Sequence, residues 1–255
     1  MSPLPKTPSF RLDGRRALVT GAGRGIGLAA AAALAEYGAE VTLVSRNAGE
    51  LAAAVDAIIA AGGKAHALVL DVTDTDAVTA AIEAAEPFHI LVNNAGTNRP
   101  KTTVDVTPDD FDVVMELNVR AAYFVAQSVA RRLVAAGVPG SIINISSQMG
   151  HVGGANRSLY CASKWAMEGF TRAMAVDLAP HGIRVNTICP TFIETALTRP
   201  YFENRAFMES VLSKIKLGRL GQVEDLMGPV VFLASDASAL MTGSSVLVDG
   251  GWTAD

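Results

Sequence analysis

Short apolar runs alternate with longer helical stretches along most of the chain, and this alternation is what most constrains the fold. An apolar run at 17–20 ends in glycines, and an alanine-rich helical stretch follows at 25–37. The same unit recurs twice, with a run and then a helical stretch at 41–44 and 50–61 and at 67–70 and 75–85. Repeated units of this kind predict parallel strands joined by right-handed crossovers.

The second half of the chain continues the alternation. Further strands are expected at 90–93, 141–145, 184–188 and 245–248, and further helices at 107–136, 159–178 and 223–234. Pro229 is expected to kink or shorten the last of these helices. Seven strands alternating with six helices, without a linker-like change in composition, predict a single-domain α/β fold with a Rossmann-type, doubly wound, parallel seven-stranded sheet.

The ends of the chain and its bulk properties exclude several classes of protein. Residues 1–10 contain three prolines and no apolar stretch, so we expect a disordered tail before a catalytic domain at 11–255. A net charge of −4 gives no basic field for nucleic acid. The longest apolar run, 28–35, is far shorter than the roughly 18 residues of a membrane span. Two cysteines make no disulfide framework, which favours a cytoplasmic location.

A glycine-rich loop, Thr20-Gly-Ala-Gly-Arg-Gly-Ile-Gly27, joins the first strand to the first helix. Its glycines allow the backbone to approach a pyrophosphate at the helix N-terminus, although such a loop alone can be a plain tight turn. The flanking strand and helix favour dinucleotide binding. The residues assigned to the cofactor here are Gly21, Arg24, Gly25, Ile26 and Gly27.

The end of the second strand bears on the choice of cofactor. An NAD site usually offers an acidic residue about 20 positions after the glycines, but this chain has Ser45 and Arg46 there. Both side chains, together with Arg24, suit the additional phosphate of NADP, unless the arginines are simply solvated surface charges. The sequence therefore predicts NADP(H) in preference to NAD(H).

Two further strand ends are expected to contact the cofactor. Asp71 could accept a hydrogen bond from the adenine and Val72 could contribute its backbone, although Asp71 could also cap the next helix. The segment Asn93-Asn94-Ala95-Gly96 would run beside the bound cofactor, or could be only an Asn-rich turn. We assign Asn94, Ala95 and Gly96 to cofactor binding.

Tyr160 and Lys164 are four residues apart on an expected helix, and therefore share one face. A tyrosine titrates near pH 10, so a base near neutrality needs a pKa shift of about 3 units, or roughly 4 kcal/mol. An ammonium about 5 Å away, at an effective dielectric near 20, supplies roughly 3 kcal/mol. The positive charge of an oxidised nicotinamide could supply the rest. By itself this spacing is a common accident of helices.

Taken together and in order, six motifs resemble the short-chain dehydrogenase/reductase family over about residues 12–252. They are Thr20–Gly27, Asn93–Gly96, Asn118, Ser147, Tyr160-Cys-Ala-Ser-Lys164 and Asp249-Gly-Gly251. The resemblance implies that Tyr160 is the general acid or base and that Lys164 lowers its pKa and holds the nicotinamide ribose. It also implies that Ser147 binds the substrate oxygen and that Asn118 binds a proton-relay water.

The segment after the sixth expected strand departs from the commonest family pattern. It reads Cys189-Pro190-Thr191, where Asn-Pro-Gly is more usual, so substrates transferred from better-known relatives are in doubt. Pro190, Thr191, Ile193 and Thr195 are nevertheless expected to contact the cofactor. The stretch at 190–221 has weak periodicity and follows a strand's carboxyl end, where open α/β sheets bind ligands. We expect a substrate lid there, since a loop this long is usually functional or disordered.

Residues expected near the reacting carbon form a mixed polar and aromatic set: Gln148, His151, Asn156, Phe192 and Tyr201. Their polarity favours hydroxylated ketones, polyols or sugar-derived alcohols as substrates. The sequence thus predicts an NADP(H)-dependent oxidoreductase that interconverts a secondary alcohol and a ketone, with no metal site. The family resemblance also implies a homotetramer, with the segment through Trp252 near a subunit contact.

Two other functions fit the same fold. A cofactor-binding sensor without turnover would have little reason to keep all four catalytic positions, which are occupied here. An epimerase or dehydratase is disfavoured because the chain lacks the additional C-terminal substrate domain common in such relatives. Nicotinamide-dependent turnover separates the enzyme from the sensor.

Overall fold

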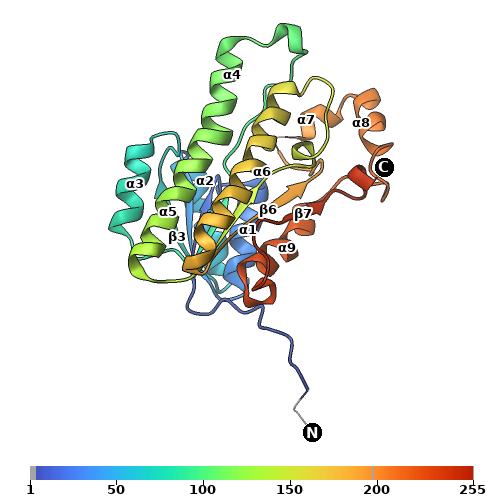
Figure 1. Cartoon of the computed structure of the whole chain (residues 1–255). Helices are drawn as coiled ribbons and strands as arrows, with labels where there is room; N and C mark the ends of the chain where they lie inside the picture. Colours follow the sequence, from blue (N-terminus) through green and yellow to red (C-terminus); the bar gives the residue numbers. More distant parts are fainter. Residues whose placement is uncertain (1–3, 197, 255) are drawn as a thin grey trace.

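A parallel sheet of seven strands forms the centre of the protein (Figure 1). The computed structural model describes residues 4–196 and 198–254. The strand order is β3-β2-β1-β4-β5-β6-β7. The strands are β1 Arg16–Thr20, β2 Glu40–Ser45, β3 Lys64–Val69, β4 Ile90–Asn93, β5 Gly140–Ile145, β6 Ile183–Pro190 and β7 Ser245–Val248. The predicted doubly wound α/β fold is confirmed.

The order of the strands reverses between β1 and β4, which lie side by side in the sheet and pair in parallel.

 In this register Ala17 of β1 lies directly opposite Ile90 of β4, a separation of 73 positions in the sequence (90 − 17). From β1 the chain winds outward to β3 on one side, and from β4 it winds outward to β7 on the other. Open α/β sheets bind ligands outside the carboxyl ends of the strands at such a reversal, so this edge is where a cofactor site is expected.

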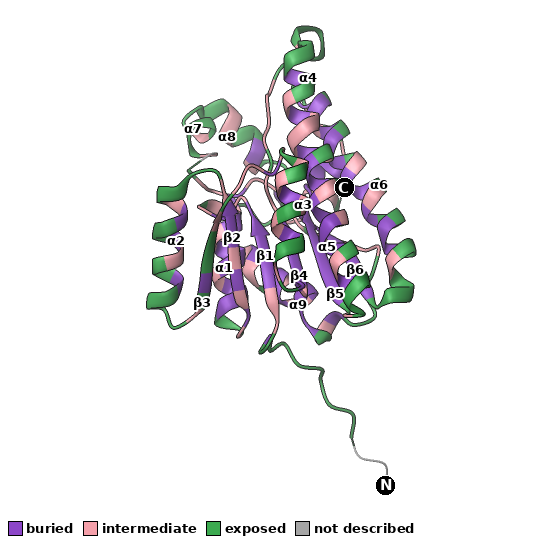
Figure 2. Ribbon diagram, turned by 90° about the vertical axis from the view of Figure 1, so that its left-hand side faces the viewer, coloured by how far each residue is buried: buried purple, intermediate pink, exposed green. Residues whose placement is uncertain are grey.

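Helices cover both faces of the sheet (Figure 2). One core lies beneath α1 Gly25–Glu36, α2 Ala48–Ala60 and α9 Glu224–Ala234. A second core lies beneath α3 Thr75–Ala84, α5 Ala122–Ala136 and α6 Ser158–Leu178. In Figure 2 the inner strands are buried, whereas the edge strand β3 is largely exposed and the helices expose their outer sides. This layering keeps the strands' carboxyl ends free to carry a site.

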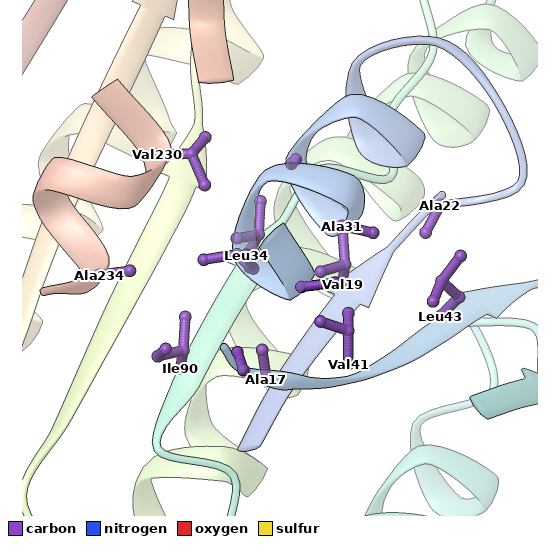
Figure 3. Packing of buried hydrophobic residues seen from close by; sticks show 14 of the residues in the cluster. Ala17, Val19, Ala22, Ala31, Leu34, Val41, Leu43, Ile90, Val230 and Ala234 are labelled. Carbon is purple, nitrogen blue, oxygen red and sulfur yellow. The ribbon is translucent and has the colours of Figure 1, made fainter. Parts of the chain in front are cut away.

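Residues alternate between the two cores along each inner strand, because successive side chains of a strand point to opposite faces. In β1, Ala17 and Val19 pack into the first core and Leu18 into the second. Figure 3 shows Ala31 and Leu34 of α1 against the first group. The small alanines of α1 let this helix approach the sheet closely, and burying each large side chain contributes roughly 1.5–3 kcal/mol.

The expected long helix at 107–136 is interrupted. It begins as α4, Pro108–Met115, with Thr107 as its N-cap in a capping box with Asp110. A π-helical turn over Glu116–Ala121 then leads directly into α5. By contrast, the expected shortening at Pro229 does not occur, because α9 continues to Ala234 with this proline inside it.

The segment at 190–221 contains two helices that the sequence did not predict, α7 Arg199–Phe202 and α8 Arg205–Leu212. They lie at the end of the molecule opposite the N-terminal tail (Figure 1). Their apolar side chains form a small core of their own, made of Val211, Ile215, Leu220 and the partly buried Phe192, Phe202, Phe207, Met208, Leu212 and Trp252. A bridge between Ile193 and Gly221 brings the two ends of the segment together.

Residues 4–10 of the expected tail form no helix or strand and are exposed. Its first three residues lie outside the described part of the chain, as do Leu197 and Asp255. None of the described helices is long and apolar enough to cross a membrane.

Candidate active site

The glycine loop after β1 is packed too tightly for side chains. A Cβ on Gly27 would lie 2.3 Å from the Gly21 carbonyl oxygen and 2.6 Å from Asn94 Nδ2. Gly21 and Gly25 have φ angles of 63° and 58°, in the left-handed region that favours glycine. The sequence therefore needs glycine at these positions to place bare backbone at the N-terminus of α1.

The N-terminus of α1 is prepared for an anion. Arg24 is its N-cap and makes no side-chain cap hydrogen bond, and the first turn contains no acidic residue. The neighbouring helix α2 is capped differently, since the side chain of Asn47 accepts hydrogen bonds from the backbone N–H groups of Gly49 and Glu50 in its first turn. The first N–H groups of α1 thus remain available, and the helix dipole favours a phosphate there.

Thr20 connects the glycine loop to the end of β4. Its Oγ1 accepts hydrogen bonds from the backbone N–H groups of Asn94, at 2.9 Å, and Ala95, at 3.0 Å. Asn94 Nδ2 in turn donates to the Thr20 and Gly21 carbonyls at 2.9 and 3.2 Å. The predicted cofactor segments are therefore held together, and the conformation of the loop is fixed from two sides.

The start of the 190–221 segment reaches the same place. Thr195 Cγ2 lies 3.6 Å from the position that a Cβ on Gly25 would take. Pro190 ends β6 and is buried, as is Ile193. Thr191 Oγ1 is sealed from solvent and has no hydrogen-bond partner within the described residues. A buried hydroxyl without a partner is costly unless a ligand supplies one, which fits a polar cofactor at this position.

Both arginines predicted near the additional phosphate of NADP make exposed ion pairs. Arg24 lies 3.4 Å from Glu50 and Arg46 lies 3.5 Å from Asp71. The arginine side chains are 65% and 76% exposed, and pairs of this kind contribute little free energy. Sequence reasoning missed Glu50, because the helix that carries it was expected to begin only at that residue.

The other two predicted adenosine contacts have structural partners. Asp71 Oδ1 accepts hydrogen bonds from the Thr73 backbone and hydroxyl at 3.0 and 2.8 Å. The cap of α3 is supplied instead by Asp74. Val72 packs into the second core. Ile26 lies partly buried against the first core.

Tyr160 and Lys164 share one face of α6 as predicted. Lys164 Nζ lies 5.6 Å from the centre of the Tyr160 ring and donates to the Ile145 carbonyl at 2.8 Å. Burial raises the pKa of Tyr160 to about 12, although Ser147 and the charge of Arg157 act in the opposite direction. Burial also lowers the pKa of Lys164 to about 8, which Cys189 and Glu168 partly oppose.

The pKa of Tyr160 thus moves in the direction opposite to the one expected from sequence. The expectation counted the charge of Lys164 but not the burial of the phenol, which dominates here. At neutral pH the chain by itself holds this phenol protonated. The protonated phenol of Tyr160 can donate a proton. For Tyr160 to ionise well below pH 12, a positive charge beyond those of the chain must lower its pKa.

Ser147 follows β5 and contacts two neighbouring groups. Its Oγ accepts from the Met149 backbone at 3.1 Å and donates to Gln148 Oε1 at 3.0 Å. A hydroxyl has only one hydrogen to donate. Ser147 donates this hydrogen to Gln148, and it would have to turn away from Gln148 to donate to a substrate oxygen. Gln148, predicted to contact substrate, is buried and acts here as the partner of Ser147.

Asn118 lies in the π-helical turn and is fully buried. Its Oδ1 accepts from the Thr97 N–H at 2.8 Å, and its Nδ2 donates to the Thr97 carbonyl at 2.9 Å and to Ser163 Oγ at 3.1 Å. Both amide hydrogens are therefore occupied. Gly96 is close as well, since a Cβ there would lie 3.3 Å from Asn118 Oδ1.

A buried carboxylate, Glu168, lies one helical turn after Lys164. It accepts hydrogen bonds from Ser245 at 2.6 Å, Thr187 at 3.2 Å and Cys189 at 3.3 Å. Burial raises its pKa, but these hydrogen bonds outweigh burial and hold the pKa below its usual value. Sequence reasoning missed Glu168, because a single acidic residue in a helix gives no signal of burial.

His151 joins this group, with Nε2 at 3.4 Å from Cys189 Sγ and 3.8 Å from Glu168 Oε1. The three ligand-capable atoms lie within 4.8 Å of one another. Hydrogen bonding accounts for this approach. The absence of a metal stays a prediction from sequence.

The remaining predicted substrate residues occupy different environments. Phe192 packs in the small core of the 190–221 segment, with ring centres 5.7 Å from Phe207 and 5.6 Å from Trp252. Asn156 is exposed and has a φ of 58°, so it acts as a turn residue. Tyr201 is half-exposed in α7.

A loop with bare backbone at a helix N-terminus, beside a Tyr-Lys pair and a serine, defines a class of nicotinamide-dependent oxidoreductases. A family model described as enoyl-(acyl carrier protein) reductase matches residues 21–253. The D-erythrulose reductase of Gallus gallus is 40% identical over 245 residues, covering 96% of this chain and 98% of that protein. The gluconate 5-dehydrogenase of Gluconobacter oxydans (strain 621H) is 42% identical over 248 residues, covering 96% of each.

A solved structure is similar over the same length. The gluconate 5-dehydrogenase from Burkholderia cenocepacia J2315, in complex with NADP and tartrate, has a TM-score of 0.92 and 40% identity. The match covers 96% of this chain and 98% of that one. The chain belongs to the short-chain dehydrogenase/reductase family. It is an oxidoreductase that acts on CH–OH groups.

Proposed function

We propose that this protein interconverts the secondary alcohol and ketone forms of a polyol or sugar-derived substrate, with NADP(H) preferred over NAD(H). The observation that carries the proposal is the Tyr160-Lys164 pair on α6, with Ser147 as a partner of the phenol. Polar groups converge around it, including Gln148 and His151. The named relatives act on a hydroxylated ketone and on a sugar acid, which supports the same substrate class.

The residues of this chain divide the chemistry of ketone reduction. The bound nicotinamide would supply the hydride. Tyr160, protonated at neutral pH, donates its proton to the carbonyl oxygen as that oxygen gains negative charge. Ser147 turns its hydroxyl from Gln148 to the same oxygen and stabilises the developing charge. Lys164, positively charged below about pH 8, stabilises the tyrosinate that remains.

In the oxidative direction the ionised Tyr160 accepts the proton of the alcohol. Asn118 is predicted to bind the water through which this proton leaves. Both hydrogens of its side-chain amide are already donated to other groups. The water would therefore be bound by an oxygen of Asn118, either Oδ1 or the backbone carbonyl oxygen. The amide itself holds the turn beside α6 in place.

The preference for NADP(H) depends on the adenosine end of the site. Gly21, Gly25 and Gly27 would let the pyrophosphate meet the N-terminus of α1. Ser45, Arg24 and Arg46 would bind the additional phosphate, which can displace the weak ion pairs to Glu50 and Asp71. Asn94, Ala95, Gly96 and the residues from Pro190 to Thr195 would surround the nicotinamide half.

Three further properties belong to the proposal. Residues 190–221 act as a substrate lid, since they carry Thr195 to the glycine loop. The protein forms a homotetramer, for which the exposed Phe111, Tyr123 and Trp165 on neighbouring helices offer an apolar face. Its location is cytoplasmic, in keeping with two free cysteines.

The test is the loss of reduced-nicotinamide absorbance with NADPH and with NADH, over ketones that range from hydroxylated to apolar. Wild type, Tyr160→Phe and the control Tyr123→Phe, an exposed tyrosine of α5, are compared. We expect NADPH-selective turnover of hydroxylated ketones that only Tyr160→Phe abolishes. Selective turnover of bulky apolar ketones would overturn the substrate class. NADPH binding without turnover on any ketone would favour the sensor.

A further inference from the structure

Arg157, the N-cap residue of α6, is a buried cation that the reaction described above does not use. It is only 8% exposed. Its side chain makes one hydrogen bond within residues 4–196 and 198–254, from Nη1 to the carbonyl of the adjacent Asn156 at 3.2 Å. No described carboxylate pairs with it. Sequence reasoning missed Arg157, because an arginine three residues before the predicted catalytic tyrosine belongs to no motif.

Arg184 shows how this chain satisfies a guanidinium that has a structural role. It donates to Ser238 Oγ at 3.0 Å and to the carbonyls of Leu233 and Ser235 at 2.8 and 3.2 Å, with Met241 at 3.4 Å. Arg157 is buried as well but has one such bond instead of four. A buried charge is strongly disfavoured unless it is paired, so the unpaired donors of Arg157 indicate an external partner.

The unpaired donors of Arg157 can be reached. Among the described residues, two side-chain atoms are sealed from solvent and lack a hydrogen-bond partner, and neither belongs to Arg157. The unpaired guanidinium nitrogens therefore keep some contact with solvent. The surrounding groups also place it at the site, since its charge interacts with Tyr201 in α7 and with Tyr160. The guanidinium therefore lies near both the reacting phenol and Tyr201 of the proposed lid.

Local backbone geometry fixes this arrangement. The Arg157 carbonyl accepts the first hydrogen bond of α6, from the Cys161 N–H at 2.7 Å. Arg157 and Tyr160 are three residues apart at the start of this helix, where such side chains are about 5–6 Å apart at Cβ. A substrate whose hydroxylated carbon contacts Tyr160 would place a group a few bonds away beside Arg157.

We propose that Arg157 binds an oxyanion of the substrate, and that the substrate is a polyhydroxy carboxylic acid or the corresponding keto acid. This inference rests on the proposed function and narrows its substrate class. A carboxylate matches the planar fork of a guanidinium with two parallel hydrogen bonds and neutralises its charge. A phosphate ester offers the same oxyanion chemistry, so the test includes both sources.

The test compares kcat/KM for oxidation of aldonic acids, alditols of the same carbon number and alditol phosphates. The proteins are wild type, Arg157→Gln, Arg157→Lys and the control Arg131→Gln, which changes an exposed arginine of α5. We expect wild type to prefer the acids to the alditols at least tenfold. Arg157→Gln should lose roughly 30- to 1,000-fold with the acids, mainly through KM. Arg157→Lys should recover part of this loss, and Arg131→Gln should match wild type.

For each variant, kcat/KM with the acids is divided by kcat/KM with the alditols. An effect of Arg157 on the pKa of Tyr160 acts on all substrates alike and therefore cancels in this ratio. Equal losses on acids and alditols would overturn the proposal, as would a wild type that favours neither the acids nor the phosphates over the alditols. Preference for the phosphates would reassign the oxyanion to a phosphate ester.

A binding measurement separates this inference from the proposed function. Calorimetric titration of the enzyme–NADPH complex with an aldonic acid needs no turnover. We expect binding to wild type and at least tenfold weaker binding to Arg157→Gln. Absent binding to a folded wild type would overturn the inference. Binding that depends on Arg157, in a protein that oxidises none of the substrates, would uphold the oxyanion site and overturn the proposed function.

Discussion

The side-chain amide of Asn118 donates a hydrogen bond to the hydroxyl of Ser163 across 3.1 Å. Ser163 immediately precedes Lys164, and its hydroxyl also donates to the Tyr160 carbonyl at 2.8 Å. The π-helical turn between α4 and α5 is thereby connected to the part of α6 that carries both residues of the proposed proton transfer. A change at Asn118 should consequently affect stability and catalysis together.

Asn118→Ala should lower the free energy of unfolding by about 2–4 kcal/mol, because the partly buried N–H and carbonyl of Thr97 and the buried hydroxyl of Ser163 lose their partner. kcat should fall more than KM rises, since the change disturbs proton transfer rather than binding. Urea unfolding and steady-state kinetics measure the two effects. Ser163→Ala, which removes only one of the bonds to Asn118, should cost less. An Asn118→Ala protein with wild-type stability would contradict the network.

The rates of the two reaction directions should depend on pH in different ways. With a pKa of about 12 before cofactor binds, Tyr160 is protonated at neutrality, so reduction should be nearly constant from pH 6 to about 8. Above that, reduction should fall as Lys164 loses its proton. Oxidation needs the ionised phenol and should rise about tenfold per pH unit until the cofactor-shifted pKa is reached. Profiles of kcat against pH test this, and oxidation that is fastest at acidic pH would refute it.

Stability should also report the buried Lys164. Its pKa is about 8 in the folded protein and 10.5 ordinarily, so the unfolded chain binds more protons between these values. Stability contributed by this site should therefore rise with pH across that window, by roughly 3 kcal/mol. We expect the stability of wild type relative to Lys164→Met to increase from pH 8 to 10.5, measured by denaturant unfolding. If the difference in unfolding free energy between the two proteins did not change with pH, burial would not lower the pKa of Lys164 in the folded protein.

Glu50→Gln should strengthen NADPH binding about three- to tenfold. The change releases Arg24 from its ion pair and removes a negative charge near the additional phosphate of NADP. NADH binding should improve less or weaken. Fluorescence titration with both cofactors measures this, and Glu83→Gln, an exposed acidic residue of α3, is the control. Weaker NADPH binding in Glu50→Gln alone would mean that Glu50 itself helps to hold the cofactor.

Gly27→Ala should abolish detectable cofactor binding and destabilise the fold by roughly 1–3 kcal/mol, because its Cβ would overlap the Gly21 carbonyl. Gly169→Ala is the matched control, since a Cβ on this exposed glycine of α6 meets nothing within 4 Å. That change should be neutral or stabilise the helix by about 0.5–1 kcal/mol. Thermal unfolding with and without NADPH distinguishes the two, and an NADPH-induced rise in Tm for Gly27→Ala would argue against the proposed loop.

The centre of the sheet could be predicted from the sequence because the inner strands β1, β4, β5 and β6 are buried on both sides and appear as apolar runs. The strand Ile90–Asn93 has the predicted bounds, and β6 begins one residue before the predicted 184–188 and extends two residues beyond it, to Pro190. Helices α7 and α8 were not predicted, because α7 has only four residues and α8 only eight. The apolar face of α8, made of Phe207, Met208, Val211 and Leu212, is therefore too short to repeat along the sequence. The π-helical turn was also missed, because its residues fit an ordinary helix equally well.

Sequence motifs located the parts of the candidate site that depend on backbone geometry. The glycine loop and the Tyr160-Lys164 spacing are of this kind, and both have the expected arrangement. Burial and charge pairing gave no such local signal. Glu168 and Arg157 were therefore missed, and the pKa of Tyr160 was expected to fall rather than rise.

The 190–221 segment has its own small core, built on Val211, Ile215 and Leu220. Substitutions on its outer surface should therefore disturb neither the sheet nor the groups of α6. Natural variation could alter which molecules are admitted while the hydride and proton transfers stay intact. One scaffold of this design can supply many metabolic specificities through changes to about 30 residues, most of which lie apart from the main cores.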